Sequence, residues 1–308
     1  MYNFALLDPR NLPVAMETND KIFGAGQVYG IEVTVPALAV RCVFNLDPQH
    51  TGGNTSRAAI EDALMAELPA EGTTLVTVRA DLDAVGSMAI FNLRRKGVSI
   101  DPAMERVLMV AISDKFARGG YTGPKPLPTR DNPWIDETAT AESSRPLAVI
   151  AAAVMDFKVS IADRVAAMEK WLLTGEEPEQ YRNSVEKERL DMITALETRQ
   201  IMHETRSNGR IAVVESTHRA ATSVGYSLAP VVVALNPSFR QGVGESYRKF
   251  TICQFAGGYV DLRSALAELD TLEAGWGGSP TIGGSPQGVS SSLTIDGVVT
   301  VVEKHLLK

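Results

Sequence analysis

Two carboxylates separated by one residue, Asp81 and Asp83, stand where an apolar run ends and a helical pattern begins. The apolar and β-branched run over 75–78 predicts a buried strand, and the stretch over 84–95 predicts a helix. Ligands bind at the carboxyl ends of the strands in parallel α/β sheets. Carboxylates this close repel each other, and a divalent metal is the simplest positive partner, because hard cations prefer oxygen ligands.

A second interpretation of the same residues needs no metal. Aspartate is a favoured N-cap residue, and the helix dipole stabilises a carboxylate near a helix N-terminus. One cap uses one aspartate, however, and capping does not explain the Gly86-Ser87 pair that follows. The residues alone therefore leave a metal site and a helix cap as equal alternatives.

The elements predicted around this motif alternate between strands and helices. After short β-like runs in the first forty residues, a strand is expected over 41–46, a helix over 55–68, and a third strand over 106–112, ending near Asp114. Helical patterns cover 148–171 and 186–205. The remaining strands are expected over 211–214, 229–235 and 250–255, and the remaining helices over 261–272 and 295–307.

This order predicts an α/β protein, with a parallel sheet that helices cover on both faces in its first part. We expect a parallel-sheet domain over 1–150, a helical connector over 151–207 and a smaller mixed α/β domain over 208–308. The net charge of −7 gives no global basic surface for long nucleic acids. The sequence contains neither a signal-peptide pattern nor an apolar run that could span a bilayer, so we expect a cytoplasmic protein without membrane association.

The motif Asp81-Leu-Asp-Ala-Val-Gly-Ser87, after a buried strand and at the start of a helix, resembles the first metal motif of the DHH phosphoesterase superfamily. Paired glycines before the last helix resemble the substrate loop of a DHHA1 domain, the smaller C-terminal domain of many such proteins. The resemblance implies hydrolysis of a phosphoester or phosphoanhydride with Mn²⁺ or Mg²⁺. It implies Asp81 and Asp83 as metal ligands, and Asp114 as a further ligand with a catalytic role.

The chain departs from the family pattern in two places. The family has a histidine where this chain has Thr77, and no Asp-His-His triplet occurs in the sequence. His50, after the strand over 41–46, is a candidate to replace the missing histidine as a ligand or as a general acid. A loop histidine bonded to the backbone is the alternative.

Two functions follow from the resemblance and its departures. The first is a metal-dependent phosphoesterase that acts on a short oligonucleotide, a dinucleotide or polyphosphate in an interdomain cleft. The second is a catalytically degenerate protein of the same fold that binds a phosphorylated ligand without hydrolysing it. In both, the partner is a phosphorylated small molecule or a short oligonucleotide, and a homodimer is the candidate assembly.

Other residues are candidates for binding the phosphate groups of a substrate. Arg118 follows the run over 106–112 and suits bidentate phosphate binding, and His218 and Arg219 follow the strand over 211–214. The glycine-rich loop over 275–288 lets backbone N–H groups approach an anion closely. The candidates in this loop are Gly277, Gly278, Ser279, Gly283 and Gly284. Solvated surface groups and a flexible connector are the alternatives.

Overall fold

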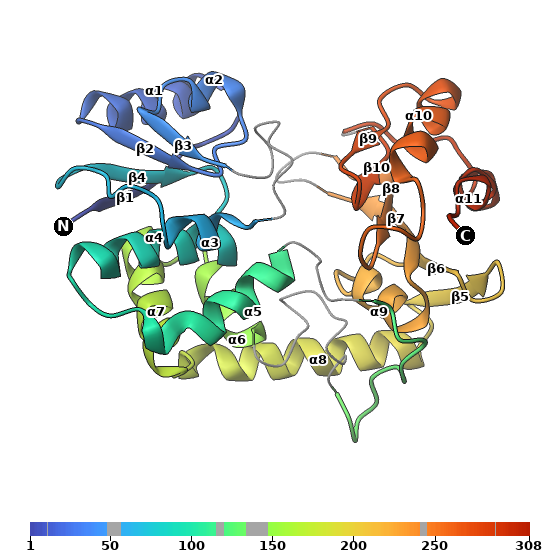
Figure 1. Cartoon of the computed structure of the whole chain (residues 1–308). Coiled ribbons are helices and arrows are strands. Elements are labelled where there is room, and N and C mark those ends of the chain that lie inside the picture. Colours follow the sequence, from blue (N-terminus) through green and yellow to red (C-terminus); the bar gives the residue numbers. More distant parts are fainter. Residues whose placement is uncertain (11, 48–56, 115–119, 134–146, 241–244, 287) are drawn as a thin grey trace. The chain divides into compact units, whose positions relative to one another are not determined.

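The computed structural model describes residues 1–10, 12–47, 57–114, 120–133, 147–240, 245–286 and 288–308. The chain divides into two compact units. The first comprises Met1–Lys115 and Pro146–Asn183, and the second comprises Phe116–Arg145 and Ser184–Lys308. Each unit is a sheet with helices packed against it, so the predicted α/β class is confirmed (Figure 1). No helix of the described residues is long and apolar enough to cross a membrane.

The first unit contains a four-stranded sheet with the order β1-β4-β2-β3, in which every neighbouring pair is parallel. The strands are β1 (Asn3–Leu6), β2 (Val28–Ile31), β3 (Phe44–Leu46) and β4 (Thr74–Thr77). Because all four strands run in the same direction, their carboxyl ends meet at one edge of the sheet. This edge is where the residues after β2, β3 and β4 leave the sheet.

Helices cover both faces of this sheet (Figure 1). On one face, Phe23 and Leu38 pack against Val28 and Val76 of the strands. These helices are α1 (Pro13–Gly24) and α2 (Pro36–Ala39). The other face carries α3 (Ala59–Ala63), α4 (Leu82–Arg95), η1 (Asp101–Ala103), α5 (Met104–Asp114), α6 (Ala148–Val154), α7 (Ile161–Thr174) and η2 (Glu179–Tyr181). Helix α4 is buried from Leu82 to Leu93, because α3, α5, α6 and α7 all pack against it.

One sequence expectation for this unit is wrong, and one helix was missed. The run over 106–112 is part of helix α5 and not a strand, and its buried residues Val107, Val110 and Ala111 show the three- and four-residue spacing of a helix. The first forty residues hold a twelve-residue helix, α1, in addition to β-structure. Pro13 in its first turn is a helix-start signal that the short β-like runs around it concealed.

The second unit contains a mixed six-stranded sheet with the order β5-β6-β7-β8-β10-β9. Its strands are β5 (Met202–Arg206), β6 (Ile211–Glu215), β7 (Val231–Phe239), β8 (Tyr247–Gln254), β9 (Gly277–Gly278) and β10 (Ile282–Gly284). Only β6 and β7 pair in parallel, and the other neighbours are antiparallel. The helix expected over 186–205 is shorter than predicted, because its last residues form β5.

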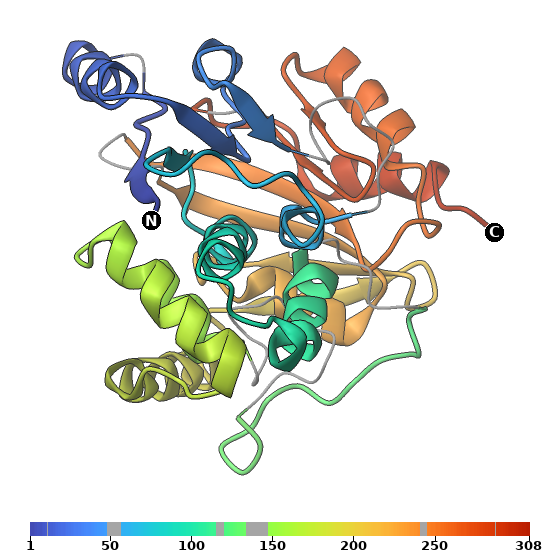
Figure 2. The same cartoon turned by 60° about the vertical axis from the view of Figure 1, so that its left-hand side comes forward.

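Alternate side chains of these strands face two different layers of helices. Val213 and Val233 pack with α10 (Leu262–Leu272) and α11 (Ile295–Lys304), which Figure 2 shows beside the strands in orange to red. Val214 and Val232 pack with α8 (Arg182–Glu197) and α9 (Ala221–Leu228). Of the helices expected as a connector, α6 and α7 belong to the first unit, and most of α8 belongs to the second.

Candidate functional site

Five carboxylates gather at the carboxyl edge of the parallel sheet, and we call them the carboxylate cluster. Glu32 and Asp47 directly follow β2 and β3, Asp81 and Asp83 stand at the start of α4 after β4, and Asp114 is the last residue of α5. The charges of the four aspartates all raise the pKa of Glu32. The five side chains therefore share one electrostatic environment.

Asp81 is the N-cap residue of α4. Its Oδ1 accepts a hydrogen bond from the N–H of Ala84 at 3.0 Å, and its Oδ2 lies 3.4 Å from Nε of Arg79. The capping interpretation is therefore confirmed for this aspartate. A cap uses one oxygen of the carboxylate, and the second oxygen makes a long, largely exposed ion pair, which contributes little to stability.

Asp83 lies in the first turn of α4 and is 1% exposed. Its Oδ2 accepts the N–H of Ala59 and its Oδ1 accepts the N–H of Ile60, both at 2.8 Å. These donors belong to the first turn of α3. Asp83, in the first turn of α4, therefore links the N-terminus of α3 to the N-terminus of α4. Burial, followed by the charge of Asp114, raises the pKa of Asp83 well above its ordinary value, although the two N–H groups act in the opposite direction.

Glu32 is a member of the cluster that sequence analysis missed. It lies inside the apolar run over 28–35, which the sequence alone indicates as a β-like segment, and a carboxylate within such a run was the available signal. The residue is 9% exposed. Burial, and then the charges of Asp83, Asp81, Asp114 and Asp47, raise its pKa to about 10.

The charges of Asp114 and Asp81 both act on Asp83, but the three side chains do not form a ready metal site, and their role as ligands stays a prediction. Asp114 reaches the cluster from the C-terminal end of helix α5 and not from the end of a third strand. Its proximity is evident because its charge raises the pKa of both Asp83 and Glu32. His50 and Arg118 lie outside the described residues.

The chemistry of the cluster fits a hard divalent cation. All five side chains offer oxygen ligands, and burial, followed by the neighbouring negative charges, raises the pKa values of Glu32 and Asp83. Among the residues that the structure describes, no three His, Cys, Asp or Glu side chains already stand close enough to hold one ion. The oxygens of Asp81 and Asp83 face helix N-termini instead.

The predicted residues His218 and Arg219 lie between β6 and α9 in the second unit. The backbone N–H of His218 donates to Oγ of Ser216 at 2.9 Å, and its Nδ1 accepts the N–H of Ala220 at 3.1 Å. Burial, followed by the charge of Arg219, lowers the pKa of His218. Arg219 forms an ion pair with Glu188. Both side chains therefore have local partners, and a phosphate-binding role for them stays a prediction.

The glycine-rich loop forms the hairpin β9–β10, and packing explains several of its glycines. A Cβ atom on Gly283 would lie 2.4 Å from Cδ1 of Leu266, and one on Gly284 would lie 2.4 Å from the carbonyl oxygen of Phe250. Gly278 is similarly closed in by the backbone of the facing strand, whereas Gly277 has open space around it. The structure accounts for these glycines without a ligand, and substrate binding by the loop stays a prediction.

The register of the second sheet separates two of the predicted substrate-binding groups. His218 follows the carboxyl end of β6. Ser279 lies in the hairpin turn, where its Oγ accepts the N–H of Ile282 at 3.2 Å. Ile282 pairs with Cys253, Cys253 with Val232, and Val232 with Ala212, near the start of β6. Ser279 and His218 therefore stand at opposite edges of this sheet.

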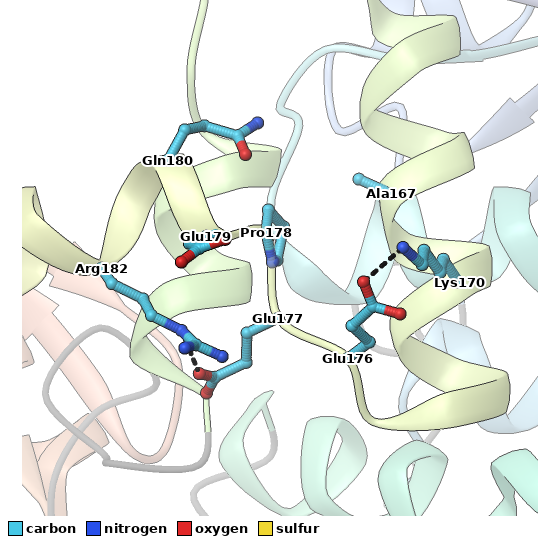
Figure 3. Close-up of a pocket in the computed structure, with 8 residues that line it drawn as sticks. All are labelled: Ala167, Lys170, Glu176, Glu177, Pro178, Glu179, Gln180 and Arg182. Carbon is cyan, nitrogen blue, oxygen red and sulfur yellow. Dashed lines mark hydrogen bonds and ion pairs between the residues drawn. The ribbon is translucent and has the colours of Figure 1, made fainter.

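A pocket in the first unit lies beside α7 and the start of α8 (Figure 3). Four of its charged lining residues are paired, Lys170 with Glu176 and Arg182 with Glu177, and Glu179 adds a fifth charge. No member of the carboxylate cluster lines it. The lining therefore has three carboxylates and two cations, an excess of negative charge that does not favour a phosphorylated ligand, so this pocket is not our candidate site.

Comparisons with known proteins found a likeness to solved structures. No family model matches the chain, and no curated protein matches its sequence. A matching solved structure is described as a pGpG-specific phosphodiesterase, PggH, from Vibrio cholerae. The two chains share 10% sequence identity at a TM-score of 0.38, over 91% of this chain and 97% of that one. A likeness this distant carries no argument about the site.

Proposed function

We propose that this protein is a phosphodiester hydrolase that works with a divalent cation, Mn²⁺ or Mg²⁺, at the carboxylate cluster. The observation that carries the proposal is the convergence of five carboxylates at the carboxyl edge of a parallel sheet, with two of them buried and raised in pKa. The resemblance of the 81–87 segment to a phosphoesterase metal motif supports the same chemistry.

In this proposal, the bound cation would polarise a phosphoryl oxygen and acidify a water molecule. Asp81 and Asp114 would hold the cation, and Asp83 would orient the site, because it fixes the N-terminus of α3 against α4. His50 is the proposed general acid, which would give a proton to the leaving oxygen of the product. A short oligonucleotide, a dinucleotide or polyphosphate is the proposed substrate.

The proposed contacts with the rest of the substrate come from the second unit. A cationic or polar group near a phosphate would hold the non-reacting end of the substrate and so supply binding energy for orientation. Arg118, His218, Arg219 and the β9–β10 hairpin are the candidates for this part. Their participation, and the interdomain cleft that it requires, stay predictions.

A specific observation favours a second function, a protein that binds a phosphorylated ligand without hydrolysing it. Asp81 and Asp83 both have structural hydrogen bonds, to Ala84 and to the first turn of α3 respectively. The family histidine is replaced by Thr77, whose hydroxyl donates to the carbonyl oxygen of Arg79 at 3.0 Å. A degenerate site of this kind would keep its ligand and lose turnover.

The two functions are separated by an assay of turnover with and without metal. Release of product from bis-p-nitrophenyl phosphate, pyrophosphate and short oligonucleotides is measured with Mn²⁺, with Mg²⁺ and with EDTA. The informative variant is Asp81→Asn, because asparagine is also a good N-cap and the substitution removes the charge while keeping the cap. Metal-dependent turnover that falls in Asp81→Asn supports hydrolysis, whereas ligand binding without product under every condition supports the second function.

A further inference from the structure

A second pocket of the first unit lies at the amino edge of the parallel sheet, the edge opposite the carboxylate cluster. Its volume is about 460 Å³, within the range of about 300–1,000 Å³ that is typical of small-molecule sites. Gln27, Val43 and Thr73 directly precede β2, β3 and β4, and all three line it. The other wall is the segment 66–70, which follows α3. No member of the carboxylate cluster lines this pocket, so it is separate from the site proposed for hydrolysis.

Two aromatic side chains form part of the lining of this pocket. Tyr29 of β2 and Phe44 of β3 stand opposite each other in the sheet, and their ring centroids are 5.2 Å apart. Tyr29 also meets Phe91 of α4 edge to face at 5.4 Å, and it is 7% exposed, whereas Phe44 is 53% exposed. The buried ring therefore supports the exposed one. An exposed aromatic ring that is held in place offers a surface on which a flat apolar molecule can stack.

The opposite wall of the pocket is held in place by hydrogen bonds from behind. The segment 66–70 is not part of a helix or strand, yet its carbonyl oxygens have fixed partners. Arg94 of α4 donates from Nη1 to the carbonyl oxygen of Ala66 at 2.7 Å. The carbonyl oxygen of Pro69 accepts the hydroxyl of Tyr2 at 2.9 Å and also a bond from Arg95. A pocket with fixed walls binds a ligand at a smaller cost in ordering.

The lining of this pocket carries one charged residue, Glu67. Glu67 is exposed, and its carboxylate has neither an ion pair nor a hydrogen bond with the residues that the structure describes. Burial is the main cause that raises the pKa of Tyr29 to about 12, and the charge of Glu67 adds a smaller effect, so this carboxylate stands near the ring. Arg94 and Arg95 do not line the pocket. Because the faces of aromatic rings also attract cations, the pocket favours a cation over an anion.

We propose that this pocket binds a small aromatic amine, with its ring against Phe44 and its ammonium group toward Glu67. The aromatic and apolar lining accounts for the ring, and the carboxylate accounts for the charged group. A phosphorylated ligand does not suit this lining, because its one charge is negative. The inference therefore adds a second ligand class to the first unit and does not rest on the proposed hydrolysis.

The test measures binding of tryptamine to the full chain by saturation-transfer NMR, with indole-3-acetate as the anionic counterpart that has the same ring. We expect wild type to bind tryptamine with a Kd of about 1 mM or below, and at least about fivefold more tightly than indole-3-acetate. Phe44→Leu keeps an apolar side chain but removes the aromatic face, so tryptamine binding should weaken by at least about threefold. Glu67→Lys reverses the charge and should remove the preference for tryptamine.

The matched control is Glu105→Lys, which changes the net charge by the same amount at an exposed glutamate outside the pocket. It should bind both ligands as wild type does. Glu67 is exposed, so Glu67→Lys should give the circular dichroism spectrum and unfolding temperature of wild type, and it carries the test even if Phe44→Leu is destabilised. Failure of wild type to bind tryptamine at millimolar concentration would overturn the inference. Equal binding of the two ligands by wild type, or an unchanged preference in Glu67→Lys, would also overturn it.

Discussion

Replacement of Asp83 by alanine is expected to destabilise the metal-free protein strongly. The side chain is 1% exposed and accepts the N–H groups of Ala59 and Ile60 at 2.8 Å. Alanine leaves both donors buried without partners. Each such donor costs about 1–3 kcal/mol, so we expect the free energy of unfolding to fall by about 2–5 kcal/mol after part of the carboxyl desolvation penalty is recovered.

The assay is urea unfolding followed by circular dichroism in EDTA, so that no cation contributes to the difference. Asp83→Asn serves as the comparison, because its carbonyl oxygen still accepts one N–H while its amide group faces the other. Its loss of stability should be smaller than that of Asp83→Ala. A change of less than about 0.5 kcal/mol in Asp83→Ala, the range of ordinary surface substitutions, would refute the reasoning.

Three further outcomes are expected. Gly283→Ala should lower the free energy of unfolding by about 1–3 kcal/mol in urea titrations, because its Cβ would meet Leu266, whereas Gly277→Ala should change it little. The folded-state pKa of Glu32, about 10, exceeds its ordinary 4.5, so the folded state holds a proton that the unfolded state lacks between these values. Without metal, the free energy of unfolding should therefore fall as pH rises from 5 to 9, by up to about 1.4 kcal/mol per pH unit. Thermal unfolding measured across this pH range should give a smaller slope for Glu32→Gln than for wild type. Equal slopes for the two proteins would contradict the assignment. Asp81→Ala should cost about 1 kcal/mol through loss of the α4 cap, and Asp81→Asn much less, when both are compared by calorimetry.

The fold class could be predicted from the sequence because its strongest signals are local. The β4–α4 unit and α10 were predicted within a few residues of their observed bounds. An apolar run followed by a helical pattern is compatible with few other secondary structures. Helix α5 was mistaken for a strand because apolar residues over 106–112 are nearly continuous, and periodicity is weak in a segment that is largely apolar. Helix α1 was missed because its buried face is small, with Ala15 and Asn19 as its buried residues.

The candidate site was predicted in part. Asp81 and Asp83 were singled out because they stand together in the chain, and the cap was recognised as an alternative role. The hydrogen bonds of Asp83 were missing from the prediction because Ala59 and Ile60 are more than twenty residues away. Glu32 was missed for the same reason. Its position beside the aspartates depends on the pairing of β2 with β4, which is not visible in the sequence around residue 32.

The most direct measurement of the central claim is the position of Mn²⁺ in crystals of this protein grown with MnCl₂, located by anomalous scattering. The account predicts an anomalous peak at the carboxyl edge of the parallel sheet, within ligand distance of oxygens of Asp81 and Asp114. A strong Mn²⁺ peak elsewhere in the molecule, with the carboxylate cluster free of metal, would contradict it.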